Sequence, residues 1–179
     1  KLGVNVKKPF DYFLLHIICQ GFLGGESIIV NGLTIYNFFK ENHPEVIRIL
    51  TQDFLWEYKG IEENKYYYEP VLSLSNGVPM WRYLRNYIEE ASIKKGVELS
   101  SDKIWAMDAL DSVLESSDFQ VRYKILDGET IFVNDRNIFH GRTPYVDAKE
   151  SNYYSETNKS KANKTIKRTG LRVWINSNY

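Results

Sequence analysis

Short segments of alternating apolar and polar residues, separated by turn dipeptides, most strongly constrain how this chain folds. Asn76-Gly77 stands between two such segments, and a two-residue connection of this kind favours an antiparallel hairpin. Asp127-Gly128 forms a turn from one such segment into the next. Aromatic residues make up 15% of the chain, with 13 tyrosines, and aromatic side chains favour strands. The pattern predicts a β-rich α+β fold of jelly-roll type with a few flanking helices.

The expected strands and helices follow from the period of the apolar residues. Strands are predicted at residues 12–19, 26–30, 54–58, 66–74, 119–126, 130–134 and 171–175, with a turn at 21–25. Helices are predicted over 33–40, from Pro44, and after a cap at Ser100 or Ser101. The last of these helices should bury an apolar stripe made of Ile104, Met107, Leu110, Val113 and Leu114. At this length, residues 1–179 are expected to form a single domain.

Charge and hydropathy exclude several classes of function. The formal net charge is zero, with 23 basic and 23 acidic residues, so the chain has no electrostatic footprint for nucleic acid. No apolar run approaches the ~20 residues of a membrane span. The single cysteine, Cys19, lies among apolar residues and rules out a disulfide within the chain. We therefore expect a cytoplasmic protein that binds neither nucleic acid nor a membrane.

Residues 146–167 differ in composition from the rest of the chain. They are rich in Ser, Asn, Lys and Thr and poor in apolar residues, which is typical of a flexible loop. We interpret this segment as an insertion and keep two alternatives for it. It is either a lid that orders over a substrate or an inert surface loop.

His140 and Arg172 are candidates for a functional site because of their sequence context. His140 ends a predicted strand and precedes Gly141, which lets another group approach the backbone closely. The alternative for His140 is a purely structural role. Arg172 alternates with Leu171 and Val173, so it points into the barrel if those two side chains face an outer packing layer.

The partner of Arg172 decides what this residue does. A buried arginine needs a carboxylate partner. That partner is either an Asp or Glu of this chain or the carboxylate of a ligand, which a guanidinium binds through two parallel hydrogen bonds. Ser27, in the Gly-Gly-Glu-Ser sequence of residues 24–27, is on its own interpreted as a turn hydroxyl that caps its own loop.

Four segments form a set when taken in order along the chain. Residues 12–27 contain a strand followed by a Gly-Gly-acidic-Ser turn, and residues 33–50 a helical segment with a break at Pro44. Residues 127–142 contain a strand pair that ends in His140, and residues 168–174 read Arg-x-x-x-Arg-x-Trp. Together they resemble the taurine dioxygenase / gamma-butyrobetaine hydroxylase family of Fe(II)- and 2-oxoglutarate-dependent oxygenases, and the resemblance runs through most of the chain.

The resemblance implies a double-stranded β-helix with Fe(II) at its open end, held by His-x-Asp (or Glu) and a distal His. It implies that His140 is the distal iron ligand and that Arg172 binds the far carboxylate of the cosubstrate 2-oxoglutarate. Ser27 would donate its hydroxyl to the same carboxylate, and Arg168 would assist or be structural only. The implied reaction uses O₂ to hydroxylate a small polar molecule, such as an amino acid, a betaine or a related acid, and releases succinate and CO₂.

The sequence departs from the family pattern in two places. The His-x-Asp motif belongs near Lys1 and Leu2, where no such pair is present. We interpret His16 as a core histidine and place His43 in a helix-capping loop. We expect the missing motif upstream of Lys1, so that the domain lacks its N-terminal part, in preference to a degenerate motif.

The second departure is the spacing between the two candidate residues. Residues 140 and 172 are 32 positions apart (172 − 140), which is long for the family, and the 146–167 segment accounts for the excess.

Two other functions remain open. A catalytically inactive jelly roll that binds a ligand or a partner without iron would explain the missing His-x-Asp pair, although the presence of both His140 and Arg172 argues against it. A cupin-like metal isomerase or sugar-binding barrel would not need Arg172 on its final strand. The run Tyr66-Tyr67-Tyr68 resembles a cage for a quaternary ammonium, but consecutive strand residues face opposite sides, so we interpret it as an ordinary strand.

Overall fold

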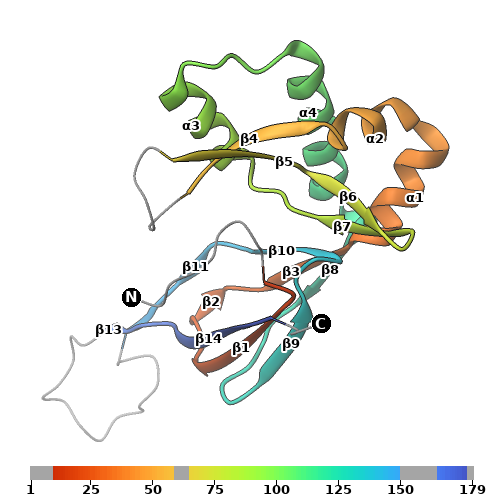
Figure 1. Ribbon diagram of the computed structural model, residues 1–179. Helices are drawn as coiled ribbons and strands as arrows, with labels where there is room; N and C mark the ends of the chain where they lie inside the picture. The colour runs from red at the N-terminus through yellow and green to blue at the C-terminus, as the bar shows by residue number, and fades with distance from the viewer. Residues whose placement is uncertain (1–9, 59–64, 150–164, 177–179) are drawn as a thin grey trace, which may run out of the picture. The chain divides into compact units, whose positions relative to one another are not determined.

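The computed structural model describes residues 10–58, 65–149 and 165–176. These residues group into two compact units. Unit 1 comprises Phe10, Val30–Gln120 and Arg136–Phe139, and unit 2 comprises Asp11–Ile29, Val121–Asp135 and the described part of His140–Tyr179. The described helices belong to unit 1 and unit 2 is made of strands (Figure 1), which confirms a mostly-sheet α+β fold.

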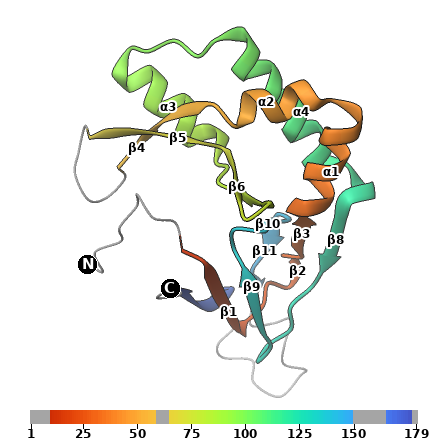
Figure 2. The ribbon, with the colours of Figure 1, turned by 45° about the vertical axis from the view of Figure 1, so that its right-hand side comes forward.

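Unit 1 combines helices with two antiparallel strand pairs (Figures 1 and 2). The helices are α1 (Gly32–Asn42), α2 (Pro44–Leu50), α3 (Arg85–Lys95), α4 (Ser101–Glu115) and a short 3-10 helix at Ser117–Phe119. The strand pairs are β4 (Asp53–Glu57) with β5 (Tyr66–Pro70), and β6 (Leu72–Ser75) with β7 (Val78–Trp81). Helix α3 lies against β4, and α2 lies against α4.

Three of these helices begin where local chemistry favours a helix start. The side chain of Asn31 accepts hydrogen bonds from two backbone N–H groups in the first turn of α1, at 2.9 and 3.2 Å. Ser100 accepts one from the first turn of α4 at 3.4 Å, and Pro44 occupies the first turn of α2. Side-chain caps satisfy N–H groups that the helix itself leaves unpaired. The predicted starts at Pro44 and after Ser100 are therefore confirmed.

The apolar faces of these helices and strands form one core within unit 1. Its largest fully buried side chains are Ile35, Phe39, Val46, Leu50, Phe54, Val71, Leu72, Ile88, Met107 and Leu110. The predicted stripe of α4 is confirmed for Met107 and Leu110, but it is wrong for Ile104, which is 40% exposed. The buried residues of α4 are Ala106, Met107 and Leu110, and Val113 and Leu114 are partly buried against the same core. Ile104 points away from this stripe, because it is turned by about 120° from Leu110 around the helix.

The hairpin predicted at Asn76-Gly77 is confirmed. Strands β6 and β7 pair in antiparallel register from Ser75 opposite Val78. Asn76 and Gly77 have φ angles of 51° and 79°, and two positive φ angles define the type I′ turn that fits a two-residue hairpin. The single strand expected over 66–74 is instead divided into β5 and β6 by the fully buried Val71.

The three consecutive tyrosines of β5 alternate between two faces, as expected for a strand. Tyr67 is 7% exposed and belongs to the core. The Nζ atom of Lys95 lies 5.3 Å from the ring centroid of Tyr66 and 5.1 Å from that of Tyr68. The aromatic rings on the outer face are therefore in contact with a lysine of this chain.

Helix α3 was not predicted, and its sequence shows why. Only Ile88, Ala91 and Ser92 are buried along its 11 residues, so it lacks a long apolar stripe. It starts after Leu84 without a side-chain cap. Its one clear signal is the stop at Gly96, which has φ of 68° and provides the left-handed C-terminal residue common in helices.

Unit 2 contains a three-stranded sheet of order β14–β1–β9. Its strands are β14 (Thr169–Ile175), β1 (Tyr12–Cys19) and β9 (Thr130–Asn134), and both outer strands run antiparallel to β1. A second sheet has the order β10–β3–β8, with β10 at Ile138–Arg142, β3 at Ser27–Asn31 and β8 at Gln120–Tyr123. The predicted strands 12–19 and 130–134 are confirmed. The turn expected at 21–25 contains β2 (Leu23–Gly24), which pairs with β11 (Tyr145–Val146).

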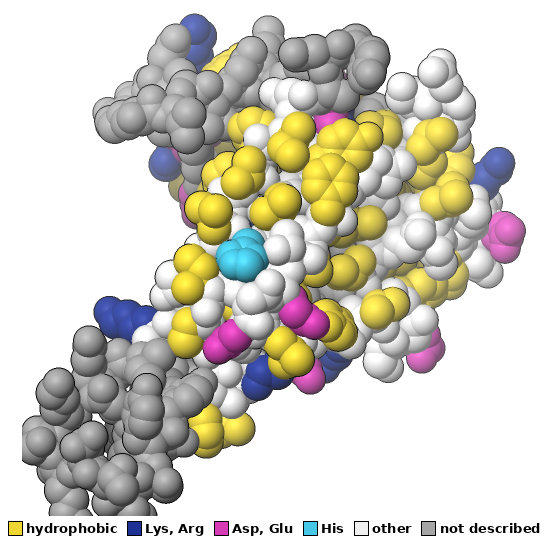
Figure 3. Space-filling model, turned by 90° about the horizontal axis from the view of Figure 1, so that it is seen from below, with side chains coloured by type: hydrophobic (Ala, Val, Ile, Leu, Met, Phe, Trp, Pro, Cys, Tyr) yellow, Lys and Arg dark blue, Asp and Glu magenta, His cyan; other side chains and the backbone are white. Residues whose placement is uncertain are grey.

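The β14–β1–β9 sheet has two different faces. On one face, Phe13 is 2% exposed and Leu15 pairs with Arg172. On the other face, Leu171 and Val173 are 55% and 41% exposed. Hydrophobic side chains are also exposed beside a histidine in the view of Figure 3. Leu171 and Val173 therefore face away from Arg172, as the alternation predicted.

His16 is not the core histidine that the sequence indicated. It pairs in register with Leu171 and Thr130, on the outer face of the sheet. Its Nδ1 atom is hydrogen-bonded to Oγ1 of Thr130 at 2.8 Å. The period of β1 buries Phe13 and Ile17 instead, because they point to the opposite side of the strand.

Most of the segment 146–167 lies outside the described residues. Near its two ends, the short strands β12 (Ala148–Lys149) and β13 (Thr165–Ile166) pair with each other in antiparallel register. The segment predicted to be a loop therefore contains one strand pair among its described residues. Among the helices in the described part of the chain, none has the length and apolar character needed to cross a membrane.

Candidate functional site

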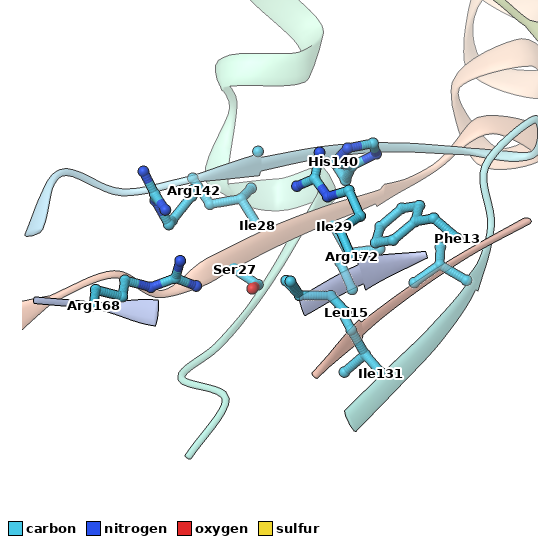
Figure 4. Close-up of a pocket in the computed structure, with 12 residues that line it drawn as sticks. Phe13, Leu15, Ser27, Ile28, Ile29, Ile131, His140, Arg142, Arg168 and Arg172 are labelled. Carbon is cyan, nitrogen blue, oxygen red and sulfur yellow. The ribbon is translucent and has the colours of Figure 1, made fainter. Parts of the chain in front are cut away.

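A pocket of about 390 Å³ lies within unit 2, above the inner face of β1. Figure 4 shows side chains from β1, β3, β9, β10 and β14 that converge on it. Its lining residues are Phe13, Leu15, Ser27, Ile28, Ile29, Ile131, Val133, His140, Gly141, Arg142, Arg168 and Arg172. All four predicted site residues therefore line one pocket. The described lining residues include three arginines and several apolar side chains, and none of them is an Asp or Glu.

His140 is held in this pocket by a carboxylate and an aromatic ring. Its Nδ1 atom lies 3.2 Å from Oδ1 of Asp135, and its ring centroid lies 4.6 Å from that of Phe13. The backbone N–H of Asp135 donates to the carbonyl of Asp11 at 2.9 Å, which fixes the turn after β9. With the proton of a neutral His140 on Nδ1, facing this carboxylate, Nε2 would keep the lone pair that a metal needs.

Arg172 reaches the same pocket from β14. It pairs with Leu15 on the inner face of the sheet, and its guanidinium lies 5.4 Å from the Phe13 ring and 5.9 Å from the Trp174 ring. Among the described residues, no Asp or Glu forms an ion pair with Arg172. The internal salt bridge considered from the sequence is therefore not formed in the described part of the chain, and Arg172 is an exposed cation on the pocket wall.

Ser27 is positioned by the glycine turn that precedes it. Gly24 has φ of +66°, and a Cβ there would clash with the carbonyl oxygen of Pro144, so the turn needs glycine. The N–H of Thr143 donates to the carbonyl of Glu26 at 2.9 Å, and the N–H of Glu26 donates to Oγ1 of Thr143 at 3.0 Å. These bonds place Ser27, which is 8% exposed, in the pocket wall (Figure 4).

Arg168 is fixed by Gln20, which directly follows β1. The Nε–H of Arg168 donates to Oε1 of Gln20 at 2.6 Å, and the buried Gln20 is itself held because its Nε2 donates to the carbonyl of Ile125 at 2.6 Å. Burial lowers the pKa of Arg168, and the positive charges of Arg142 and Arg172 lower it further. With Nε engaged, the two terminal amino groups of Arg168 remain for the pocket.

Three residues of this site were not identified from the sequence. Arg142 lies two positions after His140 on β10, so strand alternation places both on one face, and this signal was present in the sequence. Gln20 and Asp135 had no such signal. Their roles depend on partners at a distance in the sequence or across a turn, namely Arg168 and His140.

The pocket fits a dicarboxylate better than it fits a complete iron site. Three guanidinium groups and a serine hydroxyl are the donors that a carboxylate ligand requires, and no carboxylate competes with them among the described lining residues. Within the described ranges, no group of three or more His, Cys, Asp and Glu residues is placed to hold a metal ion. His140 is thus one metal ligand candidate, and the described residues provide no complete triad.

The sequence matches a known protein family and two named relatives. The family model described as "Taurine catabolism dioxygenase TauD, TfdA family" matches residues 5–157. The chain is 26% identical over 170 residues to FR-33289 synthase of Streptomyces rubellomurinus, covering 93% of this chain and 47% of the relative. It is 24% identical over 129 residues to the taurine hydroxylase-like protein SAT17 of Stachybotrys chartarum, covering 71% of this chain and 33% of the relative. The chain thus spans about half of these relatives or less.

Solved structures share the fold. An asparagine oxygenase in complex with Fe(II), 2S,3S-3-hydroxyasparagine and succinate matches with a TM-score of 0.62 and 13% identity, covering 93% of this chain and 45% of that one. The non-heme iron oxygenase OrfP in complex with Fe and alpha-ketoglutaric acid matches with a TM-score of 0.60 and 15% identity, covering 95% and 46%. On the extent of the family match, this chain belongs to the TauD, TfdA family of taurine catabolism dioxygenases.

Proposed function

We propose that this protein is an Fe(II)- and 2-oxoglutarate-dependent oxygenase that hydroxylates a small polar molecule, an amino acid or a related acid, and releases succinate and CO₂. The observation that carries the proposal is the pocket itself, in which His140, Ser27 and three arginines meet and no described lining residue is a carboxylate. Family membership and the fold shared with iron oxygenases support it. In the full domain, the two sheets would form part of a double-stranded β-helix.

The cosubstrate would bind through its far carboxylate. Arg172 stands on the inner face of β14 without an ion-pair partner among the described residues, and its planar guanidinium can offer two parallel N–H bonds. Ser27 would donate its hydroxyl to the same carboxylate, and Arg168 would add charge while Gln20 fixes its orientation. The apolar lining from Phe13, Leu15 and Ile131 would exclude water from the chain of the dicarboxylate.

His140 would hold the metal through Nε2, because Asp135 engages Nδ1. The remaining ligands of a 2-His-1-carboxylate site would come from residues other than those described here. Fe(II), when bound, supplies the redox chemistry for O₂ activation. The residues of this chain then orient the cosubstrate, keep one ligand in the correct tautomer and limit access of water.

One experiment tests this function directly. Fe(II) is titrated anaerobically into the full protein with and without 2-oxoglutarate, and the visible charge-transfer band of a chelated complex is recorded. We expect the band only when both are present. His140→Ala should abolish it, whereas His43→Ala, which changes an exposed histidine at a helix start in unit 1, should leave it unchanged.

The second candidate is a binding protein without catalytic iron. It is favoured by the lack of a cluster of three metal ligands in the described part of the chain. The same titration separates the two, because a binding protein of this kind would bind 2-oxoglutarate or a similar dicarboxylate and would show no band with Fe(II). Absence of both the band and dicarboxylate binding would contradict the oxygenase proposal.

A further inference from the structure

We propose that Gln20 is a positioning residue for the cosubstrate: its neutral amide oxygen aims the guanidinium of Arg168 at the far carboxylate of 2-oxoglutarate and leaves the positive charge of Arg168 intact. This inference rests on the proposed function, because it needs 2-oxoglutarate in the pocket of unit 2. It deepens that function by naming a residue that acts on cosubstrate affinity through another residue.

The first support is that the Gln20 side chain has only one orientation. Gln20 is 5% exposed, and its Nε2 atom donates to the carbonyl of Ile125 at 2.6 Å. Its Oε1 atom accepts from the N–H of Gly21 at 2.9 Å and from Nε of Arg168 at 2.6 Å. Turning the amide over would place two donors against each other at Arg168 and two acceptors at Ile125, and neither arrangement forms a hydrogen bond. The acceptor of Gln20 therefore faces Arg168.

The second support is that both partners are fixed through their backbones. Gln20 directly follows β1, and its N–H donates to Oδ1 of Asp127 at 2.6 Å. Arg168 directly precedes β14, and its N–H donates to Oδ1 of Asp147 at 2.8 Å. The bond between Gln20 and Arg168 thus joins two points whose backbones are held. A guanidinium that is held in place before the ligand arrives loses less conformational entropy on binding, which strengthens binding.

The third support is the space that Gly25 leaves around this bond. Gly25 has φ of +75°, and a Cβ there would lie 3.0 Å from Oε1 of Gln20 and 3.7 Å from Nε of Arg168. Figure 4 shows the guanidinium of Arg168 directed toward Ser27. The glycine turn that places Ser27 therefore also leaves room for Gln20 to hold Arg168.

The fourth support is the neutrality of the acceptor. An Asp or Glu at position 20 would also accept from Nε of Arg168, but it would form an ion pair and compete with a carboxylate ligand for the same charge. Burial and then the charge of Arg142 lower the pKa of Arg168. A bound carboxylate would offset both effects, because it favours the charged guanidinium.

The alternative is that Gln20 only ties the end of β1 to the connection between β8 and β9. The two roles differ in how the effect of replacing Gln20 depends on Arg168. A purely structural residue costs the same affinity whichever side chain stands at position 168. A positioning residue costs no further affinity once Arg168 is replaced, because it acts through that side chain.

The test is a double-mutant cycle on the full protein, in which isothermal titration calorimetry measures 2-oxoglutarate affinity and thermal unfolding shows that each variant is folded. We expect Gln20→Met and Arg168→Met each to bind about tenfold or more weakly than the wild type. The double variant should bind within about twofold of Arg168→Met. Gln120→Met is the matched control, because the Gln120 amide also donates to a backbone carbonyl, that of Leu114, at 2.7 Å, and its affinity should equal that of the wild type.

A second variant keeps the test decisive if Gln20→Met does not fold. Gln20→Asn keeps the amide but has a shorter side chain, and it takes the same place in the cycle with the same expected loss. Wild-type affinity in the Gln20 variant, or a loss that is as large in the Arg168→Met background as in the wild type, overturns the inference and leaves the proposed function standing. If the wild type itself does not bind 2-oxoglutarate, the proposed function fails and the inference fails with it.

Discussion

The Nδ1 atom of His140 lies 3.2 Å from Oδ1 of Asp135, a contact that spans the turn between β9 and β10. Side chains that bond the second nitrogen of a metal-binding histidine fix its tautomer and ring orientation, and their loss typically costs about 10- to 100-fold in metal affinity. Asp135→Ala should therefore weaken Fe(II) binding by about that factor. Asp135→Asn should weaken it less, because an amide oxygen still accepts from Nδ1. Anaerobic Fe(II) titration measures both, and equal affinities for wild type and Asp135→Ala would rule out this role.

The glycine turn before Ser27 gives a prediction on stability. Gly24→Ala meets two costs, a positive φ of +66° and a clash with the carbonyl oxygen of Pro144. Gly96→Ala meets only the first, since its φ is +68° and nothing lies within 4 Å of the added Cβ. Gly96→Ala should cost about 1–2 kcal/mol of unfolding free energy, and Gly24→Ala clearly more. Urea unfolding compares the free energies of unfolding of the two variants. Equal losses would show that the carbonyl group of Pro144 moves away from the added Cβ without a measurable cost.

Arg85 is the centre of an ion-pair network in unit 1. It bonds Glu89, Asp108 and Asp111, each at 2.7 Å, and these hydrogen bonds, that to Asp111 first, raise its pKa. Arg85→Met should destabilise the protein by about 1–2 kcal/mol at pH 7, because three carboxylates lose their shared cation. The loss should shrink at about 1 M salt, which screens charge pairs near the surface. Urea unfolding at low and high salt checks this, with Arg48→Met as the control, and a loss that is independent of salt would point to packing alone.

Glu129 makes stability depend on pH at the turn between β8 and β9. Its carboxylate accepts from the backbone N–H of Leu126 at 2.7 Å and from the Tyr123 hydroxyl, and these bonds, the backbone bond first, lower the pKa of Glu129 below its ordinary value. A lowered folded-state pKa gives stability that is present above the unfolded pKa and is lost as the pH falls through the folded pKa. The melting temperature of Glu129→Gln should therefore fall less between neutral and acidic pH than that of wild type. Glu98→Gln, at an exposed position, should follow the wild type, and parallel curves for all three proteins would contradict the prediction.

The sequence predicted elements whose signal is local. Strand β1 and the hairpin at Asn76-Gly77 were predicted correctly, because period-two alternation and a type I′ dipeptide are properties of a few adjacent residues. Helix α3 was missed because it has neither a side-chain cap nor a long apolar stripe. His16 was placed in the core, yet it lies on the outer face of β1, where hydrophobic neighbours such as Leu171 are exposed.

The same distinction applies to the candidate site. His140, Arg172, Ser27 and Arg168 were named from motifs, and the structure brings all four to one pocket, while their roles remain proposals. Gln20 was not found, because its hydrogen bond to Arg168 joins positions 148 residues apart, and no local pattern encodes such a contact. That no acid stands among the described lining residues could be seen only once the strands were placed side by side.

The most direct test of the account is the affinity of the full protein for 2-oxoglutarate, measured by isothermal titration calorimetry in wild type, Arg172→Gln and Arg48→Gln. Because bonds between charged groups contribute about 1.5–3 kcal/mol, we expect Arg172→Gln to bind the cosubstrate about 10- to 100-fold more weakly, with an unchanged melting temperature, and Arg48→Gln to match the wild type. Equal affinity in Arg172→Gln and wild type would contradict the assignment of this pocket to the cosubstrate.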